Sequence, residues 1–503
     1  MQSLESAYSA KQILRFIREK KEDFWLQLRE KRALALFHLA ARRVPAYKDF
    51  LKRNKINANK IKTWADFQGV PPVDKKNYLR KYPLEKLHWD GTVGQPMVFT
   101  ATSGSTGEPF YFSRDKQLDW QYSILAELYL QNSSHGISPT LVIVCFGMGV
   151  WIGGLITYKA FEIASQRGNY PVSIITPGIN KEEIFNVLRK LAPHYAQTII
   201  IGYPPFVKDI LDQAPERGID LKKLHIRLLF AAEAFTEKFR SYVVKTAQIP
   251  SPFLDTLNIY GTADIGAMAS ETPLTILIRR LAMQNKKLFK ALFSQIIKSP
   301  TLTQYNPLFI TFEALNDGEI LLTGINTIPL IRYAVGDHGG VFSLSDAENK
   351  LREYSLELER EAIKNKIGGH IYSLPFVYVY ERSDFSTKLY GAIIHPEPVR
   401  EALQAVEIQD SLTGKFTMFT KFDRKQNEFL EINMELKPSM NGSIHLENIV
   451  RELVIRSLLE KNSEYGAIYR GAREKTIPKF VFWPYEHPLY FKEGIKQKWV
   501  LKK

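Results

Sequence analysis

Residues 140–146 read TLVIVCF, an apolar and largely β-branched run that is typical of a strand buried on both faces. Short runs of the same kind recur along the chain, and segments with helical spacing lie between them. The expected strands are PFYFS (109–113), TLVIVCF (140–146), PVSIITP (171–177), TIIIGY (198–203), LHIRLLFAA (224–232) and TLNIYG (256–261), with later β elements at GEILLTGI (318–325) and LIRYAVGDHGGVFSL (330–344). This alternation predicts an α/β protein whose parallel sheet is covered by helices.

The flanking segments have other patterns. From Ser9 to about Leu51, apolar residues recur every three or four positions, which indicates amphipathic helices. Beyond residue 381 the sequence predicts a small α+β unit, with strands near 415–422 and 428–436 and a helix at 443–461. The expected domains are 1–95 (a helical N-terminal segment of the large domain), 96–381 (an α/β core) and 382–503 (a C-terminal α+β domain).

The composition is that of a soluble globular protein, with 45% hydrophobic and 24% charged residues among 503. The net charge of +15 attracts polyanions, such as nucleic acid, an acidic carrier protein or a phosphorylated cofactor. The basic residues are dispersed and no nucleic-acid-binding motif accompanies them, so we do not expect nucleic acid as a partner. The lone cysteine, Cys145, excludes an intramolecular disulfide and is consistent with a reducing compartment.

The sequence contains no expected membrane or export segment. Its N-terminus places charges among the apolar residues, unlike a signal peptide. The most apolar stretch, residues 141–156, is shorter than the roughly 20 residues of a membrane helix and contains glycines. A buried strand followed by a glycine-rich loop is the better interpretation, and we expect a cytoplasmic protein without membrane insertion.

The stretch TSGSTGEP (102–109) combines glycines with hydroxyl side chains. Glycines at 104 and 107 allow a tight loop whose N–H groups converge, and such a concave row of donors binds anions. The GK[ST] ending of the Walker phosphate loop is absent. Considered alone, the stretch could equally be an ordinary turn.

TSGSTGEP resembles the phosphate-binding signature of the adenylate-forming superfamily, which includes the acyl-CoA and aryl-CoA synthetases. Five further segments resemble that family's motifs in the same order: FAAEAF (230–235), NIYGTADIGAMASE (258–271), PLIRYAVGD (329–337), ERSDFSTKLYGAIIHP (381–396) and FKEGIKQKWV (491–500). Residues 44–51 and 61–83 are similar to the entry segment of the phenylacetate–CoA ligase group. The resemblance implies a large domain with sheets flanked by helices and a small mobile α+β C-terminal domain.

The resemblance also implies a two-step reaction. A carboxylic acid attacks the α-phosphorus of ATP to give an acyl-adenylate, and a thiol then displaces AMP. The implied cofactors are ATP/AMP, Mg²⁺ and coenzyme A. The acid is expected to be apolar or aromatic, because residues 146–154 and 203–206 have the character of an apolar pocket wall. A strand end in the core would explain these two segments equally well.

Each motif of the large domain carries an implied role. The phosphates would be held by Thr102, Ser103, Gly104, Ser105, Thr106 and Gly107; the nucleoside by Ala232, Glu233, Ala234, Tyr260, Gly261, Thr262 and Asp337. Asp337 would accept hydrogen bonds from both ribose hydroxyls, which suits the two oxygens of a carboxylate. Asp264 would assist magnesium, with Thr106 as a further candidate.

The C-terminal motifs imply a hinge and a mobile lysine. Arg382, Asp384 and Gly391 are in register with the family's hinge motif, as is Lys388. Rotation about Asp384 would withdraw Lys496 from the α-phosphate and bring Gly391 toward the thiol. The lysine motif is shifted by one residue, so Lys498 competes with Lys496 for the catalytic role.

The sequence departs from the family pattern at several positions, namely Glu108, Ala263, Asp264 and Glu381. Glu108 places a negative charge where many relatives carry lysine, and we expect it to face away from the phosphates. Two alternatives therefore stay open. One is transfer to an acidic acyl carrier protein or an amine instead of coenzyme A. The other is a non-catalytic binding protein that retains the fold.

Overall fold

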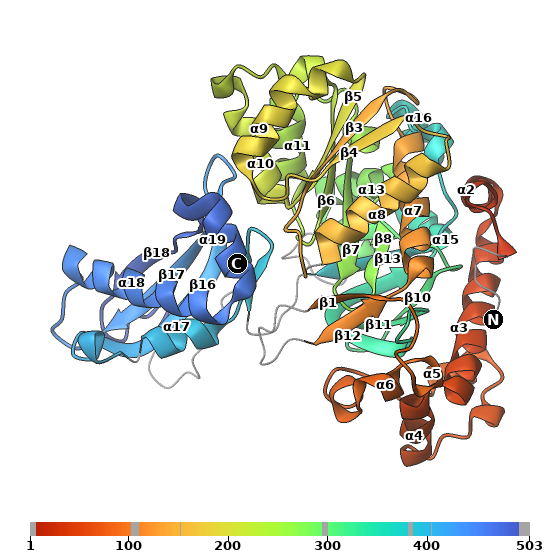
Figure 1. Ribbon diagram of the computed structural model, residues 1–503, viewed down its shortest axis with the longest axis horizontal. Coiled ribbons are helices and arrows are strands. Elements are labelled where there is room, and N and C mark those ends of the chain that lie inside the picture. The colour runs from red at the N-terminus through yellow and green to blue at the C-terminus, as the bar shows by residue number, and fades with distance from the viewer. Residues whose placement is uncertain are drawn as a thin grey trace.

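The computed structural model describes residues 7–101, 110–150, 152–293, 300–380, 386–403 and 405–491. These residues form a large unit that ends at Tyr380 and a smaller C-terminal unit that begins at residue 386 (Figure 1). The predicted domain boundary at 381/382 lies outside the described residues.

An 11-stranded sheet runs through the large unit in the order β10-β11-β12-β13-β9-β8-β7-β6-β5-β3-β4. Its strands are β3 (Thr140–Cys145), β4 (Val172–Ile175), β5 (Gln197–Gly202), β6 (Ile226–Ala231), β7 (Thr256–Thr262), β8 (Gly266–Ser270), β9 (Thr301–Gln304), β10 (Ile310–Ala314), β11 (Glu319–Gly324), β12 (Leu330–Phe342) and β13 (Phe376–Tyr380). Strands β4, β3, β5, β6 and β7 run parallel, as the sequence predicts.

The other half of the sheet, for which the sequence predicted no strand direction, has a different pairing. From β7 onward all neighbours pair antiparallel. The change occurs because a short turn at residues 263–265, not a crossover helix, joins β7 to β8. The predicted strand at 109–113 is also outside this sheet, since β1 (Val98–Ala101) and β2 (Tyr111–Arg114) pair only with each other.

Helices cover both faces of the parallel half, which explains why every residue of β3 and β5 is buried (Figure 1). One face packs against α9 (Lys181–Lys190), α10 (Pro204–Gln213) and α11 (Glu237–Thr246). The other packs against α7 (Lys116–Gln131), α8 (Ile152–Gln166), α13 (Pro273–Gln284) and α14 (Lys286–Leu292). The remaining helices there are α12 (Pro252–Asp255), α15 (Leu344–Arg352) and α16 (Leu358–Lys364).

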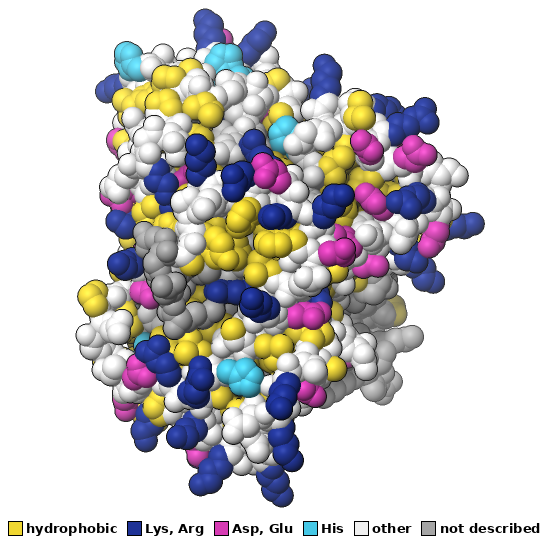
Figure 2. All heavy atoms as spheres, turned by 90° about the vertical axis from the view of Figure 1, so that its right-hand side faces the viewer, with side chains coloured by type: hydrophobic (Ala, Val, Ile, Leu, Met, Phe, Trp, Pro, Cys, Tyr) yellow, Lys and Arg dark blue, Asp and Glu magenta, His cyan; other side chains and the backbone are white. Residues whose placement is uncertain are grey.

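The N-terminal helices confirm the amphipathic pattern of the first 50 residues. They are α2 (Ala10–Glu19), α3 (Glu22–Arg43) and α4 (Pro45–Arg53), followed by the short α5 (Trp64–Gln68) and α6 (Leu84–Leu87). On the face of the molecule where these helices lie, Lys and Arg side chains are spread among Asp and Glu side chains (Figure 2). No helix in the described ranges is both long and apolar enough to span a membrane.

The C-terminal unit confirms the expected small α+β fold. It contains a β14 (Thr387–Leu389) and β15 (Ala392–Ile394) hairpin and a sheet of β16 (Leu412–Phe422), β17 (Glu428–Leu436) and β18 (Lys479–Trp483). Its helices are α17 (Pro396–Ala402), α18 (Ile444–Lys461) and α19 (Ser463–Thr476).

A buried carboxylate of the large unit, Asp209 on α10, joins the two units. It is 1% exposed and lies 3.2 Å from Lys181 of its own unit. From the C-terminal unit, Lys475 forms an ion pair with it and the Tyr390 hydroxyl donates to it at 3.3 Å. Nearby, Lys208 donates to Asn427 at 2.9 Å. The C-terminal unit is therefore docked on α10.

Candidate functional site

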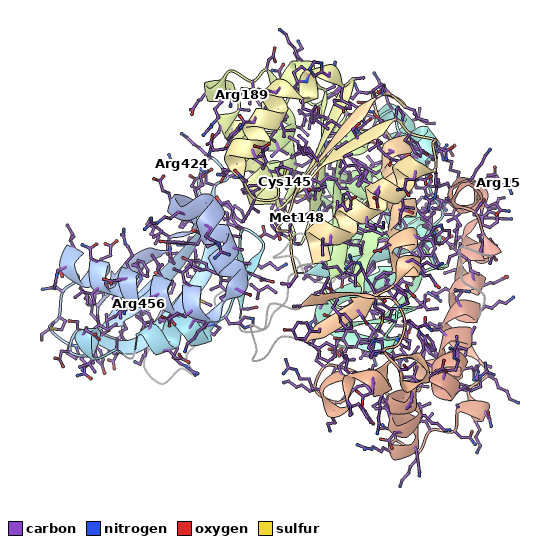
Figure 3. All side chains as sticks on the ribbon, in the orientation of Figure 1. Arg15, Cys145, Met148, Arg189, Arg424 and Arg456 are labelled. Atoms are coloured by element: carbon purple, nitrogen blue, oxygen red, sulfur yellow. The ribbon has the colours of Figure 1, made fainter. Side chains whose placement is uncertain are left out.

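The described motif residues gather at one edge of the large sheet. Glu233 follows β6 and Tyr260 lies near the end of β7, while Tyr203 follows β5. Met148 lies beyond the end of β3, on the side that faces the C-terminal unit (Figure 3). The carboxyl ends of parallel strands meet at the same edge, and ligands of open α/β sheets bind there. The topology thus brings together segments that are far apart in sequence.

Tyr260 and Asp337 are in direct contact. The Tyr260 hydroxyl donates to Asp337 Oδ2 at 2.7 Å, and both side chains are buried. Asp337 lies on β12, so this bond joins the predicted adenine-stacking residue to the predicted ribose-binding residue. Both residues were singled out by the sequence, and the structure brings them together.

Asp264 lies in the turn after β7 and is 2% exposed. Lys75 Nζ lies 3.0 Å from its Oδ1, and the Tyr333 hydroxyl donates to its Oδ2 at 2.6 Å. Lys75 and Tyr333 were not predicted as site residues from the sequence. Tyr333 is part of the RYAVGD motif, which is a usable signal, but no spacing rule links Lys75 to a turn almost 190 residues away.

The contacts of Asp264 do not fit a magnesium ion bound directly to its carboxylate. Magnesium takes one or two protein carboxylates with near-octahedral geometry. Here one oxygen faces an ammonium group and the other accepts a short hydrogen bond from a tyrosine. Within the described ranges, no group of three acidic, histidine or cysteine side chains could hold a metal ion. The magnesium role of Asp264 stays a prediction.

Glu233 and Ala232 form the second part of the site. Ala232 has φ +74°, a left-handed conformation that costs a residue with a Cβ about 1–2 kcal/mol. Its carbonyl accepts from Lys388 Nζ at 2.7 Å, and the Gly391 N–H donates to the Glu233 carboxylate. Asn258 Nδ2 donates to the Glu233 carbonyl at 3.0 Å. The β14–β15 hairpin therefore contacts the segment that the sequence assigns to adenine.

Several predicted site residues lie outside the described ranges. They are Thr102, Ser103, Gly104, Ser105, Thr106, Gly107 and Glu108 of the glycine-rich loop, Glu381, Arg382 and Asp384 of the hinge, and Lys496 and Lys498 near the C-terminus. Their roles stay predictions.

Comparison with solved structures identifies the fold. The chain is similar to 2-hydroxyisobutyryl-CoA ligase in complex with 2-HIB-AMP and CoA in the thioesterification state, with a TM-score of 0.62 and 15% identity over 97% of this chain and 91% of that chain. The fold is that of the adenylate-forming enzymes. No protein-family model and no curated protein matches the sequence.

Two other states of the same ligase are also similar. The open conformation, in complex with 2-HIB-AMP and CoA, gives a TM-score of 0.51 at 14% identity over 94% of this chain and 90% of that chain. The postadenylation state, in complex with R3-HIB-AMP, gives a TM-score of 0.50 at 15% identity over 94% of this chain and 89% of that chain. The adenylate-forming fold thus extends over nearly all of both chains.

A cavity of about 70 Å³ lies in this adenylate-forming fold, beside the turn that carries Asp264. Ile265, directly after Asp264, lines it together with Leu118 and Ala267. Most of the lining is apolar, but Gln121 also faces the cavity and is 7% exposed. The Nε2 of Gln121 has no hydrogen-bond partner among the described residues. The mostly apolar lining therefore suits an apolar occupant.

Glu464, in the first turn of α19, is a carboxyl group whose protonation makes the stability of the docked C-terminal unit depend on pH. The Ile393 N–H donates to its carboxylate at 3.0 Å. Burial raises the pKa of Glu464 to about 7, although that hydrogen bond and the Lys388 ammonium oppose the increase. Glu464 and Glu233 both face Tyr203 and, after burial, contribute to raising the pKa of its hydroxyl. The docked hairpin, which carries Lys388, therefore lies near the carboxyl groups of Glu233 and Glu464 and the hydroxyl of Tyr203.

We expect the stability of the docked C-terminal unit to fall as the pH rises from 5 to 8. A carboxyl group whose folded-state pKa is raised stabilises the fold below its unfolded pKa, and this contribution is lost as the pH rises through the folded value. Glu464→Gln should flatten this dependence, because glutamine resembles the protonated form. Thermal unfolding between pH 5 and 8.5 measures this pH dependence of stability.

Glu452→Gln, on the exposed face of α18, is the control and should keep the wild-type profile. A wild-type profile in Glu464→Gln would contradict the assignment.

Proposed function

We propose that the protein is a cytoplasmic AMP-forming ligase, similar to the phenylacetate–CoA ligases, that activates a carboxylic acid with ATP and transfers the acyl group to coenzyme A. One observation carries the proposal. The C-terminal unit places Lys388 and Gly391 on Ala232 and Glu233, beside the Tyr260–Asp337 pair. A nucleotide site that a second unit contacts in this way suits a reaction with two steps at one place.

In this proposal the chain positions reactants and needs no covalent intermediate. Asp337 would accept hydrogen bonds from the ribose, Tyr260 and Glu233 would flank the adenine, and residues 102–107 would bind the phosphates. Magnesium would enter with ATP as part of the substrate. Cys145 is not a candidate nucleophile, because burial raises its pKa well above the usual range of a thiol.

The docked hairpin supports the thioester-forming step. Gly391 N–H donates to the Glu233 carboxylate, as expected if the hairpin approaches the nucleotide during transfer. The thioesterification state of 2-hydroxyisobutyryl-CoA ligase gives a higher TM-score than its open or postadenylation state, and this order supports the same interpretation.

The cavity beside Asp264 supports an acid with an apolar body. Its lining near the site is apolar at Leu118, Ile265 and Ala267. A volume of about 70 Å³ accommodates the end of a side chain, not a whole acid. Matched acids with small and with bulky apolar ends therefore belong in the substrate panel.

Acid-dependent exchange of pyrophosphate into ATP tests the proposal. We expect exchange with an apolar acid, and thioester formation when coenzyme A is added. Lys496→Ala should lose exchange but still use a supplied acyl-adenylate, whereas Lys498→Ala should retain both. Transfer to a holo-carrier protein or an amine, but not to coenzyme A, would correct the acceptor. No exchange with any acid, in folded protein, would contradict the proposal and favour a non-catalytic protein.

A further inference from the structure

Lys75 brings a positive charge to the buried carboxylate of Asp264, in the turn after β7. Its Nζ lies 3.0 Å from Asp264 Oδ1 and 5.8 Å from the centre of the Phe112 ring. Phe112 belongs to β2, and β1 and β2 are the two strands that precede and follow residues 102–109. The ammonium group is therefore near both β2 and the turn after β7.

The backbone around Lys75 is held firmly against β12. The Val73 N–H donates to the Arg332 carbonyl at 3.1 Å, and the Ala334 N–H donates to the Val73 carbonyl at 2.8 Å. These bonds bracket Tyr333, the second partner of Asp264. Asp74 then accepts from the N–H groups of residues 76 and 77, both at 2.6 Å. Lys75 is thus fixed relative to β12, on which Asp337 also lies.

The Lys75 side chain remains accessible. It is 33% exposed, while the Asp264 side chain is 3% exposed. An ammonium group has three donors, and in the described part of the chain Asp264 and the Phe112 ring are its contacts. Donors are therefore available to a ligand that enters the site from solvent.

We propose that Lys75 binds a phosphate group of the nucleotide and that Asp264 anchors Lys75 instead of holding a metal ion. This inference rests on the proposed function. Lysine binds phosphate as a point charge. A cation fixed in a partly buried site acts more strongly than one in water. The same geometry explains why the Asp264 carboxylate does not fit magnesium, since a cation already lies against it.

Calorimetric titration with adenosine, AMP and α,β-methylene-ATP, in EDTA at fixed ionic strength, tests the role of Lys75. Lys75→Met should weaken binding of the ATP analogue about tenfold or more, the effect of losing a charged hydrogen bond, and leave adenosine binding unchanged. Lys76→Met is the matched control, because Lys76 is exposed, and should match the wild type. Equal losses for adenosine and the ATP analogue, or no loss at all, would overturn the proposal.

A second measurement uses the unmodified protein, in case Lys75→Met does not fold. The ATP analogue should protect Lys75 from acetylation, measured by mass spectrometry, while adenosine should not. Lys76 serves as the internal reference and should react equally in both samples. Protection of Lys75 by adenosine alone, or by neither compound, would contradict phosphate binding. Wild-type protein that binds no nucleotide would overturn the proposed function itself, whereas wild-type binding with no Lys75 effect would overturn only this inference.

Asp264→Asn separates an anchor from a metal ligand. The readout is the ratio of the affinities for the ATP analogue with Mg²⁺ and with EDTA. As an anchor of Lys75, Asp264 has no part in that ratio, so the wild type and Asp264→Asn should give the same value. If the ratio of the two affinities fell toward one in Asp264→Asn but not in the wild type, Asp264 would be a ligand of the metal ion. That result would overturn the proposal.

Discussion

Replacing Gly391 with alanine should reduce thioester formation by about 100-fold or more, equivalent to roughly 3 kcal/mol, while acid-dependent pyrophosphate exchange stays near the wild-type rate. Gly391 has φ +86°, and a Cβ there would lie 2.5 Å from Tyr203 Cε1. Tyr203 cannot easily move, because its ring packs edge-on against Phe146 at 4.9 Å. The hairpin could then no longer dock on Glu233.

Gly414→Ala is the matched control for Gly391→Ala. Gly414 belongs to the same unit and has φ +80°, but nothing lies within 4 Å of its Cβ position. It therefore reports backbone strain without the clash, and we expect a thioester rate close to that of the wild type. Rates of acyl transfer from supplied acyl-adenylate and of pyrophosphate exchange measure the two steps separately. Wild-type transfer by Gly391→Ala would show that the docked hairpin takes no part in it.

Arg240→Met should destabilise the large unit by about 3–5 kcal/mol, the usual cost of breaking a buried ion pair from one side. Arg240 is fully buried on α11. Its guanidinium donates to Glu237 at 3.0 Å, to both oxygens of Glu271 at 2.7 Å and to the Thr256 carbonyl at 3.0 Å. Methionine would fill most of the space but leave two buried carboxylates short of a partner. Thermal and urea unfolding measure the loss.

The same network supports the nucleotide site. Glu271 accepts from the Asn258 N–H at 2.8 Å, and the Asn258 side chain holds the Glu233 carbonyl. Arg240→Met should therefore also weaken nucleotide binding. The control is Arg456→Met, whose partner Glu452 lies on the exposed surface of α18 (Figure 3). Surface pairs of this kind contribute about 0–1 kcal/mol. Equal stability losses in both variants would contradict a special role for the buried network.

We expect low pH to lower the stability of the fold through the same buried ionic network around Arg240. Burial raises the pKa of Glu237, but Arg240, Arg279 and Arg280 outweigh burial and hold it below its usual range. A depressed carboxylate pKa stabilises the fold above the unfolded pKa, and that contribution is lost as the pH falls. The wild type should therefore lose stability below about pH 4.5, and Arg240→Met should lose less over the same range.

The sequence predicted the parts of the fold that local patterns specify. Buried apolar runs such as β3 and amphipathic segments such as α2 to α4 depend on nearest neighbours along the chain, and they were found close to their observed bounds. The β elements expected at 318–325 and 330–344 correspond to β11 and β12, but the sequence did not specify their direction. Strand direction depends on whether a short turn or a crossover helix follows, and the turn at 263–265 has no glycine–asparagine signature. The periodicity of apolar residues along the chain does not indicate which distant strands pair with each other.

The residues of the candidate site likewise fall into two groups: those that a local motif identifies and those that only the folded structure brings together. Tyr260 and Asp337 stand in motifs with fixed spacing, so the sequence could single them out. Lys75 could not be found in this way, because its role depends on which turn lies beside it after folding. The ionic network around Arg240 was missed for the same reason, since its members lie on α11, α13 and the segment between β8 and α13.

The contacts of the Asp209 carboxylate bear on how easily the two units could separate. It retains Lys181 from its own unit when Lys475 and Tyr390 of the C-terminal unit leave. Undocking therefore removes one of two cations and never isolates a buried negative charge, the situation that makes many buried ion pairs hard to separate. In the proposed two-step reaction, the two units could therefore separate and dock again without a large electrostatic barrier.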